Sequence, residues 1–323
     1  MMAVNSGGPA DGDAGRPGAE TPQRRATTHI ARRVLGLRPG DRLPNIYELR
    51  TEIGVGTGTV QSALRELQTR EAVTLKPRQR HGTIVVGRRV DVLWRSAELG
   101  SLVVILPLPN SWEFQGLASG LRAELDHLGV PSTLMYAHGS EQRATAVRES
   151  HGHVAVMSLA AGLFWQDRAG DIGVGLELPP ATYYAADSVL VMASLARRDL
   201  PERPRVGIDR LSVDHTRLTE AEFPDADHVE VSYAQLPVAL RRGAIDAAVW
   251  HRTALGLSLN DQGLRTWPLA RPEALAVSDG LSAATLVVRG DDAASGGVLA
   301  ELDIDRILAV QRSVVHGELL PLY

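Results

Sequence analysis

The sequence predicts an α/β protein with an N-terminal winged helix-turn-helix and a two-lobed α/β domain behind it. Near the N-terminus, two helical patterns flank the glycine turn Gly54-Val55-Gly56, and a basic hairpin pattern follows them. From Ser101 onward, short apolar runs alternate with helical patterns, which is typical of an α/β fold with a largely parallel sheet.

The helix-turn-helix lies between Gly40 and Arg70. Asn45 suits a helix N-cap, and Glu48 follows at the spacing of a capping box. A second helix is expected from about Thr57. An amphipathic helix over residues 24–35 precedes both. Apolar residues recur at helical spacing in the two later helices, at Ile46, Leu49, Ile53, Val60, Leu64 and Leu67.

Two short β-like runs over residues 73–86 predict a hairpin beside the second helix. A basic hairpin in this place suits contact with phosphates or the minor groove. Its turn region carries Lys76, Arg78, Arg80 and His81.

Residues 26–87 resemble the winged-helix domain of the GntR family of bacterial transcription regulators. Tyr47, Thr57 and Gln61 stand where family members often carry arginine, so the bidentate arginine–guanine contact is not available there. Motif positions that match in order and spacing are Gly40, Leu43-Pro44, Glu48-Leu49, Gly54-Val55, Thr59-Val60, Ala63-Leu64, Leu67 and Gly82-Thr83. The resemblance implies a double-stranded DNA operator contacted by Asn45, Tyr47, Thr57, Thr59, Gln61, Arg65, Lys76, Arg78, Arg80, His81 and Gly82. A winged helix used for protein contacts is the alternative.

Composition bounds the rest of the chain. Its 323 residues suit two domains of ordinary size, and it contains no cysteine, which excludes disulfides and thiolate metal sites. We find no signal peptide and no apolar run long enough to cross a membrane, so a cytoplasmic protein is expected. The net charge is −4, yet residues 24–95 hold 15 Lys/Arg against 6 Asp/Glu, or +9. Only this basic module is expected to meet nucleic acid.

The predicted domains are a disordered tail (1–23), the winged domain (24–87), a linker (88–100) and a two-lobed effector domain (101–323). Trp94 in the linker is expected to pack between domains. No lysine follows Lys76, which excludes the pyridoxal-phosphate domain of some GntR-type proteins. A second lobe is expected to begin after Pro204, with a capping box over Ser232–Gln235. A long helix is expected over residues 297–316.

Two lobes with the chain returning to the first are the plan of type II periplasmic-binding-protein folds. Residues 206–215 and 240–250 resemble the second lobe of such proteins. Residues 106–121 resemble the start of the effector domain of YhfZ-type regulators, a GntR-related group. This resemblance implies a small-molecule effector of unknown identity.

An effector is expected at the carboxyl ends of strands, near helix N-termini. Hydroxyl groups, an amide and helix N-termini suit an anionic or polar molecule. The residues expected to bind it are Asn110, Ser111, Trp112, Ser158, Asp209, Ser212, Ser232, Tyr233, Trp250 and Arg252. We expect no metal site and no cofactor, and we expect His151 and His153 to have a non-metal role.

The favoured hypothesis is a ligand-responsive DNA-binding regulator. A homodimer is expected because one short recognition helix reads few bases. The alternative is an enzyme that acts on a small metabolite in the cleft, although no catalytic constellation is recognisable. A chorismate-lyase-like effector domain is a third, less favoured possibility.

Overall fold

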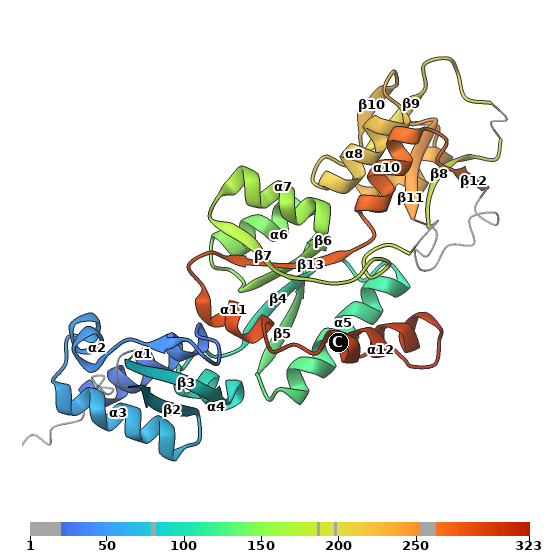
Figure 1. Cartoon of the computed structure of the whole chain (residues 1–323). Helices are drawn as coiled ribbons and strands as arrows, with labels where there is room; N and C mark the ends of the chain where they lie inside the picture. The colour runs from blue at the N-terminus through green and yellow to red at the C-terminus, as the bar shows by residue number, and fades with distance from the viewer. Residues whose placement is uncertain (1–20, 79–81, 186–187, 197–198, 252–262) are drawn as a thin grey trace, which may run out of the picture.

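The computed structural model describes residues 21–78, 82–185, 188–196, 199–251 and 263–323. A winged domain, a first α/β lobe and a second α/β lobe follow one another along the molecule (Figure 1). The tail predicted for residues 1–23 lies mostly outside the described residues, but its last two residues are helical because α1 begins at Pro22.

The winged domain has the predicted helix-turn-helix and hairpin. Asn45 completes a capping box: its Oδ1 accepts hydrogen bonds from the Tyr47 and Glu48 N–H groups, and Glu48 Oε2 accepts one from Asn45 N–H at 2.6 Å. Gly54 ends the helix at φ 72°, which glycine adopts without strain. The elements are α1 (Pro22–Leu35), β1 (Arg42–Leu43), α2 (Ile46–Ile53), α3 (Thr57–Thr69), β2 (Val73–Arg78) and β3 (Gly82–Arg88).

The predicted linker is a packed helix rather than an extended connection. Helix α4 (Val90–Ser96) contacts α1. Trp94 is only 1% exposed, and its Nε1–H donates to the Gly100 carbonyl at 2.8 Å. One hydrophobic cluster runs from Leu35 in the winged domain through Trp94 into the first lobe. The winged domain and the first lobe therefore share a core, as predicted for Trp94.

The first lobe, lobe 1, is built on a five-stranded sheet in the order β5-β4-β6-β13-β7. Strands β5 and β6 lie parallel to β4, whereas β13 is antiparallel to β6 and β7. The elements are β4 (Leu102–Leu106), α5 (Trp112–His127), β5 (Ser132–Tyr136), α6 (Gly139–Arg148), β6 (Val154–Ser158), α7 (Leu159–Ala169), β7 (Ile172–Glu177), β13 (Ala284–Arg289), α11 (Ala293–Leu299) and α12 (Ile304–Val315).

The second lobe, lobe 2, carries a five-stranded sheet in the order β10-β9-β11-β8-β12. Its strands are parallel across β10, β9 and β11, and antiparallel where β8 meets β11 and β12. The elements are β8 (Val189–Ser194), β9 (Arg205–Ile208), α8 (Val213–Glu222), β10 (Asp227–Glu230), the 3₁₀ turn η1 (Tyr233–Gln235), α9 (Leu236–Arg241), β11 (Ala247–His251), β12 (Leu264–Pro268) and α10 (Pro272–Gly280).

The prediction of largely parallel sheets is wrong, because the chain crosses between the lobes twice. It leaves lobe 1 after β7 and returns after α10, as Figure 1 shows, and the strands β8 and β13 that follow the crossings run against their neighbours. Strand β8 therefore belongs to lobe 2, which begins before residue 204. Strand β12 and helix α10 were not predicted.

Two local predictions are also wrong. The helix expected over residues 297–316 is two helices, because Asp303 caps α12 by accepting a hydrogen bond from the Arg306 N–H at 3.1 Å. Ser232 makes no side-chain cap, and the segment it was expected to open starts as the 3₁₀ turn η1. No helix among the described residues is long and apolar enough to cross a membrane.

Candidate functional sites

The exposed face of α3 carries three of the residues predicted to contact DNA. Gln61 and Arg65 are exposed and Thr57 is half-buried, at intervals of one helical turn. Val60, Ala63 and Leu67 form the opposite, buried face. A helix with a buried apolar side and a free polar side can enter the major groove.

The neighbouring DNA-binding predictions have different settings. Tyr47 on α2 is 72% exposed, Asn45 is engaged as the α2 cap, and Thr59 is half-buried. Lys76, Arg78 and Gly82 are exposed on the β2–β3 hairpin, where Arg78 pairs with Gly82 across the ladder. In the described part of the chain, Arg65, Lys76 and Arg78 form no ion pair with a carboxylate, so their charges are available to phosphates. Arg80 and His81 lie outside the described residues.

A cavity lies between the two lobes. Its volume is about 70 Å³. Lobe 1 and the crossover between the lobes contribute Pro107, Leu108, Asn110, Phe114, His138, Gly139, Arg143, Tyr183 and Tyr184; lobe 2 contributes Val189, Ser212, His215, Leu218, Tyr233, Val249, Trp250 and His251.

Aromatic rings form much of the cavity wall. The Phe114 ring centroid is 4.8 Å from that of Tyr183, and the Tyr184 centroid is 4.7 Å from that of His251. The Tyr233 and Trp250 rings stack at 4.6 Å and 8°. Such walls fit the apolar part of a small molecule.

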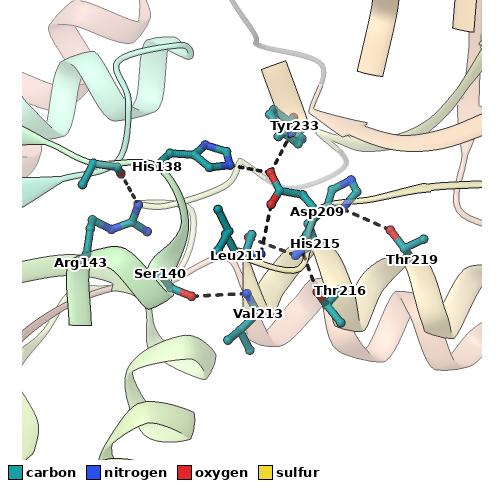
Figure 2. Close-up of polar contacts among 12 residues, drawn as sticks. His138, Ser140, Arg143, Asp209, Leu211, Val213, His215, Thr216, Thr219 and Tyr233 are labelled. Atoms are coloured by element: carbon teal, nitrogen blue, oxygen red, sulfur yellow. Dashed lines mark hydrogen bonds and ion pairs between the residues drawn. The ribbon is translucent and has the colours of Figure 1, made fainter. Parts of the chain in front are cut away.

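The N-terminus of α6 holds the two lobes together (Figure 2). The Glu141 N–H donates to the Leu211 carbonyl at 3.2 Å, and the Val213 N–H donates to Ser140 Oγ at 3.3 Å. Gly139 permits this approach, because a Cβ at that position would collide with the Leu211 carbonyl oxygen, and its φ is 71°. The described arrangement is therefore a closed one.

A second interlobe contact joins His138 to Asp209. His138 Nε2–H donates to Asp209 Oδ2 at 2.6 Å, and the Tyr233 N–H donates to the same oxygen at 2.7 Å (Figure 2). Burial alone would raise the pKa of Asp209, but these hydrogen bonds and the charge of His138 hold that pKa below its usual value. Asp209 thus acts as an ionised anchor for lobe 1 and for η1.

A third interlobe contact joins Ser158, at the end of β6, to Asp214 on α8. Ser158 Oγ–H donates to Asp214 Oδ1 at 2.7 Å while Oγ accepts from the Ala161 N–H at 3.0 Å. Both side chains are buried. Burial raises the pKa of Asp214 to about 6, against the opposing hydrogen bond from Ser158 and the charges of Arg143 and Arg217.

Two buried histidines beside the cavity are neutral at pH 7. The Asp209 N–H donates to His215 Nδ1 at 3.0 Å, so His215 Nε2–H donates to the Val249 carbonyl at 3.1 Å. Burial lowers the pKa of His215 to about 4 and that of His251 to about 3. Within the described residues, no group of three His, Asp or Glu side chains is placed to hold a metal ion. His153, one of the pair considered at the sequence level, accepts a hydrogen bond from the Val103 N–H at 2.9 Å.

The predicted effector residues divide into three groups. Asn110, Ser212, Tyr233 and Trp250 line the cavity. Ser111, Ser158 and Asp209 are buried beside it, as a cap of α5 and as the two interlobe anchors described above. Neither Trp112, which is 42% exposed, nor Ser232 lines the cavity, and Arg252 lies outside the described residues.

Several cavity residues were missed at the sequence level. His138 follows strand β5, and His251 is the last residue of β11, so the strand-end argument applied consistently would have included both. Arg143 lies one turn inside α6, and Tyr183 lies in a crossover without regular structure; no local pattern marks either residue.

Comparison with known proteins agrees with both parts of the structure. Residues 22–85 match the model described as bacterial regulatory proteins, gntR family, and residues 90–323 match the YhfZ C-terminal domain. The chain is 30% identical over 300 residues to the uncharacterised protein YhfZ of Escherichia coli (strain K12), covering 92% of this chain and 96% of that one. The chain belongs to the YhfZ family.

Solved structures place the YhfZ-type domain among two-lobed binding folds. The crystal structure of YhfZ from Shigella flexneri is 29% identical, with a TM-score of 0.57, covering 72% of this chain and 98% of that one. The periplasmic aliphatic sulphonate binding protein SsuA from Escherichia coli is 13% identical with a TM-score of 0.50, covering 68% and 75%, which shows likeness of fold alone. The predicted α/β class, with a winged helix and a periplasmic-binding-protein-like domain, is confirmed.

Proposed function

We propose that this chain is a cytoplasmic transcription regulator whose affinity for DNA is controlled by a small molecule bound between its two lobes. The observation that carries the proposal is a cavity between the two lobes on the same chain as a GntR-type DNA-binding domain. A two-lobed fold links binding to domain closure, because a ligand in the cleft contacts both lobes only when they are closed.

The DNA contacts are assigned to α3 and the hairpin. Thr57, Thr59 and Gln61 contact bases in the major groove, and Arg65, Lys76 and Arg78 contact phosphates. The α3 helix spans 13 residues, so one copy reads only a few bases and a homodimer supplies a second half-site.

The coupling between cavity and DNA-binding domain is assigned to a joint of α1, β3 and α11. The side chain of Arg88, at the end of β3, is buried and donates to the Leu35 and Gly297 carbonyls and to Glu301 Oε1, the last at 2.8 Å. Helix α11 follows β13, the strand that returns from lobe 2. A movement of β13 on closure of the lobes can therefore reach α1 through its packing against α11 (Figure 1).

The DNA part is tested by replacing Arg65 and Arg78 with alanine and measuring binding to DNA from the chain's own promoter region against salt. Each lost phosphate contact should lower the slope of log K against log salt by about 0.9. Arg148→Ala is the control, because Arg148 is ion-paired with Asp171 on lobe 1. If the double variant kept the affinity and the salt slope of the wild type, the assignment of α3 and the hairpin to the DNA interface would be wrong.

The enzyme alternative gains no support from the site. Ser158 Oγ–H donates to Asp214, whereas the nearby His215 is hydrogen-bonded to the backbone at both ring nitrogens. This is not the serine–base contact that nucleophilic catalysis needs. A cavity ligand recovered chemically unaltered after long incubation would support the sensor over the enzyme.

A further inference from the structure

Arg143 is a cation buried at the wall of the interlobe cavity. Its side chain projects from α6, and the residue is 3% exposed. Nε–H donates to the Val156 carbonyl at 2.8 Å, and the two terminal nitrogens donate to the Ala137 carbonyl at 2.9 Å and the Tyr183 hydroxyl at 3.1 Å. A guanidinium has five N–H groups, so one on each terminal nitrogen remains for another acceptor.

The charge of Arg143 has no paired carboxylate in the described part of the chain. Its three acceptors are neutral, and Asp214, whose pKa reflects the charge of Arg143, is hydrogen-bonded to Ser158 instead of forming an ion pair with Arg143. A buried charge is stable only when it is paired and hydrogen-bonded, so this position favours an additional anion.

The other polar groups at the cavity do not supply that anion. His215 and His251 are neutral, and His138 gives its Nε2–H to Asp209. The rings of Phe114 and Tyr184 line the same cavity as Arg143 and provide an apolar wall. A small organic ion with one negative charge matches both surfaces better than a fully hydrated inorganic ion does.

We propose that the effector is a small monocarboxylate, held by the two remaining N–H groups of Arg143 with its apolar part against Phe114 and Tyr184. Planar guanidinium and carboxylate groups match in bidentate geometry, and a single negative charge balances one arginine. This inference rests on the proposed function of the cavity.

The test is a calorimetric titration of the full chain with sodium acetate, propionate, butyrate and benzoate. Each acid is compared with its amide, and sodium chloride at equal ionic strength controls for salt. At least one acid should bind saturably, with its amide on the order of 100-fold weaker, because the amide cannot neutralise Arg143.

Variants of the arginine separate charge from geometry. Arg143→Gln should lower the acid affinity on the order of 100-fold. Because this change could also unfold α6, Arg143→Lys is measured in parallel: it keeps the charge, should fold, and should still lose affinity because it lacks the planar fork. Arg148→Gln, an exposed position of the same helix, is the matched control and should bind as the wild type does.

Equal binding of acids and amides, no binding of any acid to the folded wild type, or unchanged acid affinity in both Arg143 variants would each overturn the inference. The proposed function fails in a different way. It is refuted when a saturating cavity ligand of any class leaves DNA affinity unchanged, whereas the carboxylate inference alone fails when only a neutral ligand occupies the cavity and alters DNA affinity.

Discussion

Replacing Ser158 with alanine should open the cleft without touching the cavity. Ser158 does not line the cavity, but its hydroxyl donates to Asp214 across the lobes at 2.7 Å. A hydrogen bond to a charged group contributes about 1.5–3 kcal/mol. Its loss should therefore shift the equilibrium between closed and open forms by roughly 10- to 150-fold toward the open form.

Ser158 also caps α7 by accepting a hydrogen bond from the Ala161 N–H, so the variant loses a helix cap as well as the interlobe hydrogen bond. Loss of the cap costs about 0.5–2 kcal/mol of stability. It weakens lobe 1 in the open and the closed forms alike, so it cancels from the closure equilibrium. Asp303→Ala is the control, because it also removes a helix cap, that of α12. Asp303 contacts Arg306 and Glu124, which both lie in lobe 1, so this variant leaves the contacts between the lobes intact.

The chain has no cysteine, so two introduced cysteines give a unique pair of spectroscopic labels. Asp167→Cys on α7 and Glu230→Cys on β10 place exposed labels on opposite lobes. Pulsed electron paramagnetic resonance should show a longer interlobe distance in Ser158→Ala than in wild type or Asp303→Ala. The role of the interlobe hydrogen bond would be refuted if wild type, Ser158→Ala and Asp303→Ala gave the same distance distribution while thermal unfolding showed that both variants had lost the stability of a helix cap.

Two further predictions concern the joint and the buried titratable groups. Gly297→Ala should cost about 1–3 kcal/mol of stability, because its Cβ would collide with the Leu35 carbonyl, whereas Gly296→Ala meets no atom within 4 Å and should be neutral or stabilising; equal unfolding midpoints for the two variants would contradict the close packing of α1 and α11. Folding lowers the pKa of His215 and His251, so these two residues reduce the free energy of unfolding as the pH falls from about 6.5 toward 4. Folding raises the pKa of Asp214, so this residue increases the free energy of unfolding as the pH falls from about 6 toward 4. Asp214→Asn should therefore make acid destabilisation steeper between pH 6 and 4 in chemical denaturation, and an unchanged pH profile would contradict this assignment.

The winged domain was predictable because its signals are local. Asn45 and Glu48 form a capping box through residues three apart, and Gly54 ends α2 through its own backbone conformation. The apolar spacing of α3 and the basic hairpin also depend on near neighbours in sequence. For such elements, propensity and tertiary packing favour the same structure.

The cavity was only partly predictable, because its chemistry depends on contacts between distant residues. The expectation that ligands bind at the carboxyl ends of strands correctly selected Asn110 and Tyr233 as cavity residues. It omitted Arg143, whose hydrogen-bond partners Val156 and Tyr183 are 13 and 40 residues away in the sequence. The direction of β8 and β13 was missed for the same reason. Strand periodicity reports which side chains are buried and not which way a strand runs beside its neighbour.

The most direct test of the account locks the lobes together and measures DNA binding. A hydrogen bond joins the backbones of Glu141 and Leu211 across the lobes at 3.2 Å, and cysteines are introduced at these two positions to form a disulfide between the lobes. DNA from the chain's own promoter region is titrated with the oxidised and the reduced double variant, and each single-cysteine variant controls for the effect of reductant. If closure governs the winged domain, the oxidised and reduced proteins should differ at least about fivefold in DNA affinity. Equal affinities, with the disulfide verified by mass, would contradict the claim that closure of the lobes controls DNA binding.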